Sequence, residues 1–332
     1  MVNYFIMVVI LNLNMATDKT HYIPNFTNGM TARKNPDLVL AGGKGVNVAR
    51  ALNSFMDDYL LMGFCSGYSG RFIMSLIKKE GLKSKIIYQN DYESRTCVSV
   101  IDKNGVSTDL NEEGAYISKS SQDKFFDAFK KALKKADVVS ISGRTPYNIK
   151  SDFYRKLISE AKNNNKKIFV DLTDDSLRTC LQHGVNCVKI NAKEFCDFSG
   201  MKISEKSIRK VFIKYKENGL ETLIVTDGHN PSLAINNKCF YRVLPPKIDD
   251  FISGVGAGDS FMAGFIYSQI NNYDFEKALL TATAFASSDC KTLGAGIISK
   301  NDIRKYYAQV EVQTTEDRSQ MTEDRSQKTE GR

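Results

Sequence analysis

Short apolar runs bounded by turn residues recur along this chain, and segments with helical spacing lie between them. Each run is short enough to be a single strand, and near-continuous apolarity is typical of strands that are buried on both faces. Phe125, Phe129 and Leu133 form an apolar stripe with a period of 3.6 residues between two of the runs. This alternation predicts a mostly parallel sheet covered by helices. The runs are residues 5–13, 59–64, 138–141, 168–172 and 222–226.

Two stretches interrupt this alternation. Residues 15–38 are polar and contain prolines and glycines, and residues 88–112 consist of short alternating pieces. Asn104-Gly105 lies inside the second stretch, and Asn-Gly between alternating runs is a strong hairpin signal. We expect the two stretches to form a small β-sheet added to the main domain.

The C-terminal end has a different composition. The hexapeptide TEDRSQ occupies residues 315–320 and is repeated at residues 322–327. These copies are too few and too polar to build a repeat domain, so we expect a disordered tail over residues 312–332. The rest of the chain, residues 1–311, is expected to be one domain.

Composition excludes several classes of function. The net charge of +8 is spread along the chain without a basic stripe, which argues against nucleic-acid binding but suits an anionic small substrate. Seven cysteines without a CxxC pair are typical of a reduced, cytoplasmic protein, and three scattered histidines give no zinc-binding spacing. No apolar stretch reaches the roughly 18 residues of a membrane span, and the N-terminus lacks the features of a signal peptide.

The glycine-rich segment GVGAGD at residues 254–259 is the strongest candidate for a catalytic site. It opens a predicted helix whose first N–H groups have no partner within the helix. This arrangement suits phosphoryl transfer, with the amides of Gly256, Ala257 and Gly258 holding the developing negative charge and Asp259 accepting a hydroxyl proton. The alternative is that Asp259 only stabilises the helix dipole.

A second glycine turn, AGGKGVNVAR at residues 41–50, also opens a predicted helix. It has neither the GxxxxGK[ST] spacing of a Walker A loop nor the GxGxxG of a dinucleotide site. In the functional interpretation, Lys44 and the turn amides hold a phosphate and Asn47 reaches a sugar hydroxyl. In the alternative, the segment is a tight turn with a solvated lysine.

The two motifs together, in this order, resemble the paired signatures of the ribokinase-like, PfkB-type carbohydrate kinases. The resemblance extends over about residues 7–310. Residues 108–114 (TDLNEEG) resemble a segment of the sugar-phosphate branch, which comprises the 1-phosphofructokinases and tagatose-6-phosphate kinases. Further matches are residues 14–20 (NMATDKT), 191–194 (NAKE) and 226–228 (TDG).

The resemblance implies a fold and an assembly. The fold is a ribokinase-like three-layer αβα sandwich with a mostly parallel central sheet and a small β-sheet lid. Lid segments matching residues 15–38 and 88–112 cover the sugar in this family and often form a dimer interface. A homodimer through the lid is therefore expected.

The resemblance also implies roles for substrate-binding residues. Asp18 would accept hydrogen bonds from sugar hydroxyls, and the alternative for it is a turn residue. Lys44 and Arg95 would pair with the phosphate already on the sugar, because the planar fork of arginine suits a phosphate. Gly43 and Asn47 would complete this site.

Nucleotide-binding roles follow in the same way. Glu194 would organise Mg²⁺ through water, and Asn191 would lie near the ATP phosphates. The alternative is that Asn191 and Glu194 form a helix capping box, which is compatible with the other role. Lys189, Thr226 and Gly228 would complete the nucleotide site.

The implied function is ATP-dependent phosphorylation of a ketose phosphate, with fructose 1-phosphate, converted to fructose 1,6-bisphosphate, as the favoured substrate. A tagatose-6-phosphate kinase is the nearest alternative, and a kinase of an unphosphorylated sugar is a more distant one. A catalytically silent sugar-phosphate-binding protein is the alternative from another class. Departures from the family pattern at Arg144, Pro231 and Gly254 leave the exact sugar and nucleotide fit open.

Overall fold

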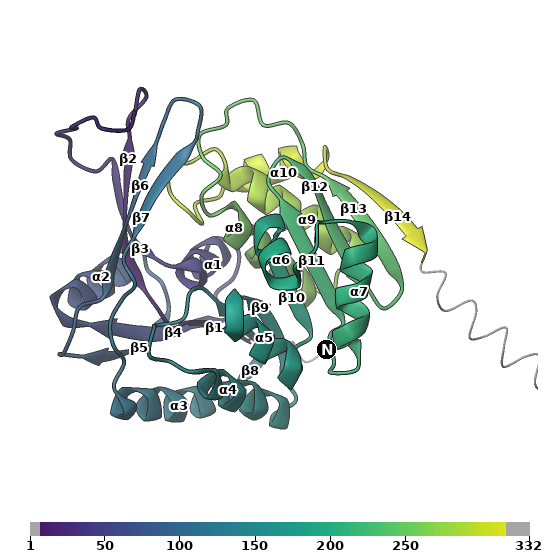
Figure 1. Ribbon diagram of the computed structural model, residues 1–332, viewed down its shortest axis with the longest axis horizontal. Coiled ribbons are helices and arrows are strands. Elements are labelled where there is room, and N and C mark those ends of the chain that lie inside the picture. The colour runs from purple at the N-terminus through teal and green to yellow at the C-terminus, as the bar shows by residue number, and fades with distance from the viewer. Residues whose placement is uncertain (1–6, 317–332) are drawn as a thin grey trace, which may run out of the picture.

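The computed structural model describes residues 7–316, which are built around one large sheet (Figure 1). Its ten strands lie in the order β14-β13-β12-β11-β10-β9-β8-β1-β4-β5. The pairs from β11 to β5 are parallel, whereas β12, β13 and β14 pair antiparallel at one end. The strands are β1 Met7–Asn12, β4 Tyr59–Ser66, β5 Ser84–Gln89, β8 Ala136–Ser142, β9 Lys167–Asp171, β10 Cys187–Asn191, β11 Thr222–Asp227, β12 Asn230–Asn236, β13 Cys239–Leu244 and β14 Glu311–Glu316.

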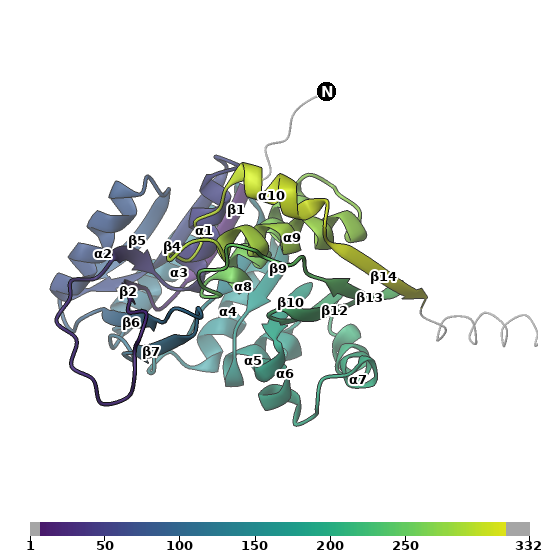
Figure 2. The ribbon, with the colours of Figure 1, turned by 90° about the horizontal axis from the view of Figure 1, so that it is seen from above.

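Helices cover both faces of this sheet (Figures 1 and 2). Val9 and Leu11 of β1 pack into one core with α3 to α7, and Val8 and Ile10 pack into a second core with α1, α2, α8, α9 and α10. Both faces of β1 are therefore buried, as its continuous apolarity predicts. The helices are α1 Lys44–Asn53, α2 Gly67–Lys79, α3 Lys119–Leu133, α4 Ser151–Asn163, α5 Asp174–His183, α6 Ala192–Ser199, α7 Glu205–Lys216, α8 Ala257–Ile270, α9 Phe275–Asp289 and α10 Lys300–Tyr307.

A separate four-stranded sheet has the order β3-β2-β6-β7. The predicted hairpin is present, because β6 and β7 pair antiparallel around a turn in which Gly105 has a φ of 76°. The predicted first segment, residues 15–38, ends too early, since β3 continues the small sheet beyond it. Antiparallel pairing with β2 carries the backbone as far as Gly42. The strands are β2 Ala16–Tyr22, β3 Leu38–Gly42, β6 Arg95–Ile101 and β7 Ser107–Asn111.

The predicted start of a disordered tail at residue 312 is wrong. Strand β14 pairs antiparallel with β13 along its whole length, and Val312 packs against the core. Hydrogen bonds to an open sheet edge order this polar segment although its composition alone does not. Only the beginning of the first repeat copy falls in this strand, and residues 317–332 lie outside the described part.

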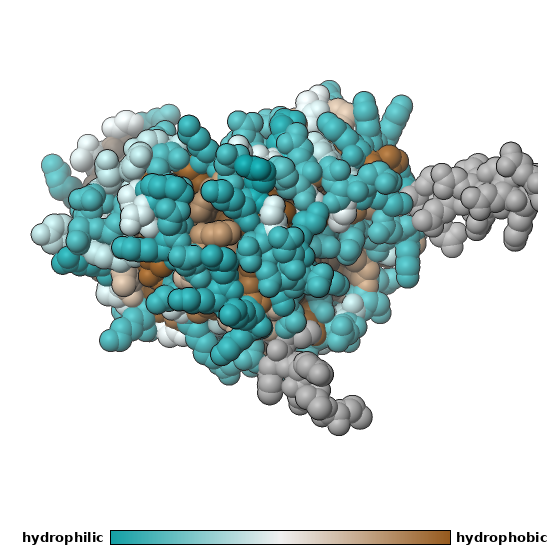
Figure 3. Space-filling model, turned by 90° about the horizontal axis from the view of Figure 1, so that it is seen from below, coloured by the Kyte–Doolittle hydropathy of each residue, from teal (hydrophilic) through white to brown (hydrophobic). Residues whose placement is uncertain are grey.

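No helix within residues 7–316 combines the length and apolarity needed to cross a bilayer. All seven cysteines are free thiols. The face in Figure 3 is mostly hydrophilic, with only small apolar patches between polar side chains. The apolar side chains are thus largely collected in the two cores.

Candidate active site

The candidate site lies at the carboxyl ends of the parallel strands. The chain runs from β1 to β4 on one side and later returns to β8 on the other, and ligands bind in α/β folds at such a reversal of strand order. Asn12, the last residue of β1, accepts a hydrogen bond at Oδ1 from the Gly45 N–H at 2.8 Å. This bond holds the first glycine turn directly above the reversal.

The second glycine turn ends at Gly256, the N-cap of α8, which has a φ of 89°. A Cβ on Gly256 would collide with Ala295, so both conformation and space require glycine here. Among residues 7–316, the amides of Gly256 and Gly258 have no backbone acceptor, whereas the Ala257 amide donates to the Gly254 carbonyl at 3.3 Å. Two of the three amides that the sequence predicts for an anion are therefore available, and the third is held in a turn.

Asp259 lies in the first turn of α8 with only 6% of its surface exposed. Its Oδ2 accepts a hydrogen bond from Asn47 Nδ2 at 2.8 Å. Burial, together with the negative charge of Asp171, raises the pKa of Asp259 to about 6. A carboxylate with a pKa close to neutrality is suited to accept and release a proton.

Asp171, at the end of β9, joins two lysines in a buried ion cluster. Its carboxylate lies 2.6 Å from Lys44 Nζ and 2.7 Å from Lys189 Nζ. Burial alone would raise the pKa of Asp171, but the charges of Lys189 and Lys44 lower it below its usual range. A Cβ on Gly258 would lie 2.6 Å from Lys189 Nζ, so this ammonium is beside the free amides of α8. The cluster brings positive charge to the predicted phosphoryl-binding turn.

Sequence reasoning missed Asp171, although it is the one charged residue inside the predicted apolar run 168–172. Lys44, which was expected to hold the phosphate of the sugar, also bonds Glu194 Oε1 at 3.0 Å. The structure thus joins Lys44 to residues of the predicted nucleotide site. Whether it also contacts the sugar phosphate stays a prediction.

Asp18 and Arg95 lie on the small sheet, on the paired strands β2 and β6. The Asp18 carboxylate lies against Gly42 of β3, where no side chain would fit. Burial raises the pKa of Asp18, and the charges of Arg95 and Arg50 oppose this rise. Arg95 donates from Nε to the Asn14 carbonyl at 3.2 Å. The structure therefore brings the two predicted sugar-binding residues together.

The predicted capping box is present at the start of α6. Asn191 Oδ1 accepts from the Glu194 N–H, and Glu194 Oε2 accepts from the Asn191 N–H, both at 2.8 Å. Thr226 Oγ1 donates to the Ile190 carbonyl at 3.5 Å, and Gly228 forms the turn after β11 with a φ of 58°. These four residues lie at neighbouring strand ends, as a shared nucleotide site requires.

The acidic residues of this site fit only a loosely held divalent ion. No group of three or more possible metal-ligating side chains occurs among the described residues. Mg²⁺ commonly keeps several waters and uses one or two carboxylates together with substrate phosphates. Glu194, with 17% of its side chain exposed, fits such a role.

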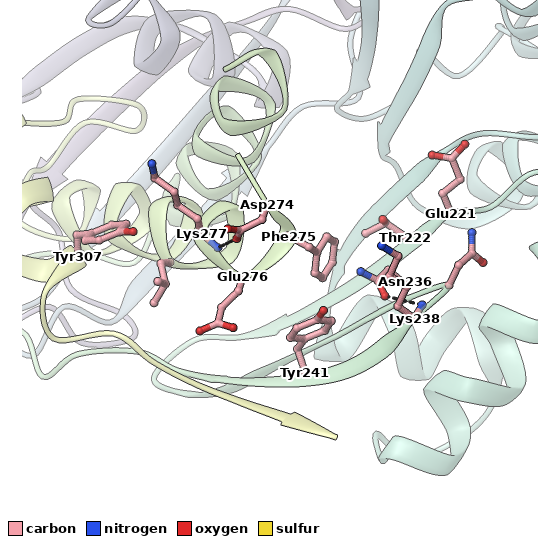
Figure 4. Close-up of a pocket in the computed structure, with 12 residues that line it drawn as sticks. Glu221, Thr222, Asn236, Lys238, Tyr241, Asp274, Phe275, Glu276, Lys277 and Tyr307 are labelled. Carbon is pink, nitrogen blue, oxygen red and sulfur yellow. Dashed lines mark hydrogen bonds between the residues drawn. The ribbon is translucent and has the colours of Figure 1, made fainter. Parts of the chain in front are cut away.

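A cavity of about 850 Å³ lies elsewhere (Figure 4). It lies near the opposite end of β11, where Thr222 begins the strand, and its wall includes Tyr241 and Phe275. None of the predicted site residues lines it. Its lining mixes acidic and basic side chains and does not contribute to the cluster around Asp259.

The profile described as pfkB family carbohydrate kinase matches residues 13–302. The chain belongs to the pfkB family of carbohydrate kinases. A curated relative, the tagatose-6-phosphate kinase of Staphylococcus epidermidis, is 27% identical over 310 residues, which cover 92% of this chain and 99% of the relative.

Solved structures of other proteins have the same fold as this pfkB family member. A possible 1-phosphofructokinase from Thermotoga maritima superposes with a TM-score of 0.84 at 22% identity, covering 93% of this chain and 99% of the other. The tetrameric inhibited form of phosphofructokinase-2 from Escherichia coli gives 0.81 at 22% identity over 92% and 99%. The predicted ribokinase-like α/β fold is confirmed. The relatives named here support the predicted enzyme class, a sugar-phosphate kinase.

Proposed function

We propose that this pfkB kinase phosphorylates a ketose phosphate with ATP, with fructose 1-phosphate as the favoured acceptor and fructose 1,6-bisphosphate as its product. The observation that carries the proposal is the buried carboxylate of Asp259 beside the unpartnered amides of Gly256 and Gly258. A base and an anion-binding turn at one helix start are what transfer of a phosphoryl group to a hydroxyl requires.

Asp259 accepts the proton of the attacking hydroxyl while Asn47 keeps its carboxylate oriented. The amides at the start of α8, with Lys189 beside them, stabilise the negative charge on the group in transfer. Mg²⁺, held near Glu194 through water, would neutralise charge on the ATP phosphates. Asn191, Thr226 and Gly228 border the nucleotide.

On the acceptor side, Asp18 holds hydroxyls of the sugar, and Arg95 with Gly43 and Lys44 holds its phosphate. Arg144 is exposed and has no ion pair with another described residue. It follows Gly143, which lies beside Asn12 and Lys44. We assign Arg144 as a third cation for the substrate phosphate, beside Arg95 and Lys44.

The small sheet acts as a lid that excludes water, which otherwise competes for the phosphoryl group. It is also the proposed interface of a homodimer, and the tetrameric phosphofructokinase-2 supports assembly in such folds. A cytoplasmic location suits an enzyme with seven free thiols.

The test is ADP production with Mg·ATP on a panel of fructose 1-phosphate, fructose 6-phosphate, tagatose 6-phosphate, fructose and ribose. Strong turnover on fructose 1-phosphate is the expected result. The S. epidermidis relative favours tagatose 6-phosphate as the second candidate, and a kcat/KM comparison separates the two. Turnover only on a bare sugar would contradict the phosphate roles of Arg95 and Lys44. No turnover on any sugar would favour a catalytically silent binding protein.

A further inference from the structure

Arg50 on α1 is a buried cation to which the proposed chemistry gives no role. Only 9% of its surface is exposed, and its guanidinium donates to four acceptors. Its Nε bonds Glu80 Oε2 at 2.6 Å, where α2 ends. One terminal nitrogen bonds Asn47 Oδ1 at 2.8 Å and the Ala295 carbonyl at 2.6 Å, and the other bonds the Ala41 carbonyl. These four acceptors belong to three parts of the site: Ala41 with Glu80, Ala295, and Asn47.

The first part is strand β3 of the small sheet. Arg50 and Glu80 together hold the backbone of Ala41, because Arg50 binds its carbonyl and Glu80 Oε1 accepts from its N–H at 3.0 Å. The next residue, Gly42, lies directly against the Asp18 carboxylate. The position of Arg50 and the position of the sugar-binding strand pair are therefore linked.

The second part is the loop that follows α9. Ala295, whose carbonyl Arg50 binds, packs against Gly256, where even a Cβ would collide with it. Gly256 is the N-cap of α8 and supplies one of the free amides. Arg50 thus reaches the anion-binding turn through one intervening residue.

The third part is the base itself. Because Arg50 donates to Asn47 Oδ1, the amide of Asn47 presents its Nδ2 donor to Asp259. A rotated amide would direct its oxygen at the carboxylate and lose both hydrogen bonds. The orientation that helps the base is therefore fixed by Arg50.

We propose that Arg50 is a positioning residue that couples the placement of lid strand β3 to the orientation of Asn47 at the base and to the anion-binding turn. The proposal rests on the proposed kinase function for its catalytic consequence. Its structural part, one guanidinium that orders three separate segments, does not depend on the substrate. Sugar binding against β3 would then favour the arrangement in which the base and the turn are ready.

The chemistry requires arginine rather than a generic cation. A guanidinium offers five N–H donors in a rigid planar fork, whereas the lysine ammonium is a point charge on a flexible stem. Arg50→Lys can keep the ion pair with Glu80 but cannot reach all four acceptors. Loss of Asn47 orientation is the expected defect in this variant.

The first experiment measures steady-state kinetics and pH profiles of Arg50→Lys and Arg50→Gln. We expect kcat to fall about 10- to 100-fold, with KM for ATP within about twofold of wild type. We expect the acid limb of kcat to move to higher pH by up to about one unit, because the carboxylate loses its hydrogen bond. The charged groups that face Asp259 from other elements, Asp171, Lys44, Lys189 and Asp289, are not substituted in these variants, and Arg50→Lys also keeps the positive charge that lowers the pKa of Asp289.

Arg209→Gln is the matched control, because Arg209 also pairs with a glutamate, Glu205, but on α7 away from the site. It is expected to lower the melting temperature without moving the acid limb. If Arg50→Lys loses stability but keeps the wild-type kcat and acid limb, the positioning role is overturned. Glu80→Gln is a milder variant that keeps an acceptor for the Ala41 N–H and leaves the bond from Arg50 to Asn47 in place, so kcat and the acid limb should change less than in Arg50→Lys. A larger change in Glu80→Gln than in Arg50→Lys would contradict the proposal.

A measurement without substrate separates this proposal from the proposed function. Amide hydrogen exchange of the free protein is expected to rise in Arg50→Lys both in residues 38–42 and in residues 292–297, relative to wild type and Arg209→Gln. Unchanged exchange in either segment would overturn the coupling. If the wild-type protein is silent on every sugar but Arg50→Lys still shows this joint rise, the kinase assignment is refuted and the coupling stands.

Discussion

Asn47 donates a hydrogen bond to Asp259 at 2.8 Å although the two residues are 212 positions apart in sequence. The first lies on α1 after one glycine turn, and the second lies on α8 after the other. This contact joins the two motifs into one site. The bond also uses one N–H donor of the Asn47 side chain, which the sequence analysis assigns to a sugar hydroxyl. Asn47 therefore contacts the proposed base as well.

Asp259→Asn is expected to lower kcat by roughly 10²- to 10⁴-fold, since the proton acceptor is lost while the shape is kept. Titration calorimetry should show that ATP and sugar phosphate still bind. Near-normal turnover in this variant would remove Asp259 as the base.

Wild-type activity is expected to fall below an apparent pKa of about 6, because protonated Asp259 cannot accept the hydroxyl proton. Asp171→Asn removes a negative charge that raises this pKa, so the acid limb should move to lower pH. A pH series of kcat for both proteins measures the shift. An acid limb that moves to higher pH in Asp171→Asn would contradict the assignment of Asp259 as the base.

Asp171→Asn should also destabilise the fold, because Lys189 keeps only 4% of its side chain exposed and loses its partner. Breaking a buried ion pair in this way costs about 3–5 kcal/mol. Denaturant unfolding measures the loss. Asp197→Asn, which removes an exposed ion pair with Lys193, is the control and should change stability by less than about 1 kcal/mol.

The sequence alone predicts much of the fold and the residue types of the site. Continuous apolar runs indicate buried parallel strands, and glycine turns before helices indicate where anions bind. Asp171 could not be recognised, because its role depends on Lys44, 127 residues away, as well as on Lys189. Strand β14 was missed because its order comes from pairing with β13 and not from its own polar composition.

Gly256→Ala is expected to destabilise the protein by about 1–3 kcal/mol, since the left-handed backbone and the contact with Ala295 both exclude a side chain. It should also reduce kcat by disturbing the anion-binding amides. Gly254→Ala is the matched control, because a Cβ there meets nothing within 4 Å. Equal melting temperatures and equal kcat for the two variants would argue against a special role for Gly256.

Arg95→Ala is expected to raise KM for the ketose phosphate about 10- to 100-fold, as loss of a charge-assisted contact of about 1.5–3 kcal/mol implies. Arg144→Ser should act in the same direction but more weakly, because Arg144 is exposed. KM for ATP is the internal reference and should stay constant. An unchanged sugar KM in Arg95→Ala would favour an unphosphorylated sugar as substrate.

The position of β1 has a consequence for synthesis on the ribosome. This first strand lies in the middle of the sheet, and its neighbour β4 is complete at Ser66, whereas its other neighbour β8 begins only at Ala136. At about 5–20 residues per second, the intervening roughly 70 residues take several seconds to translate. During that interval one edge of the apolar strand β1 has no neighbouring strand. We expect chaperones that bind emerging polypeptides to bind the nascent chain at this stage.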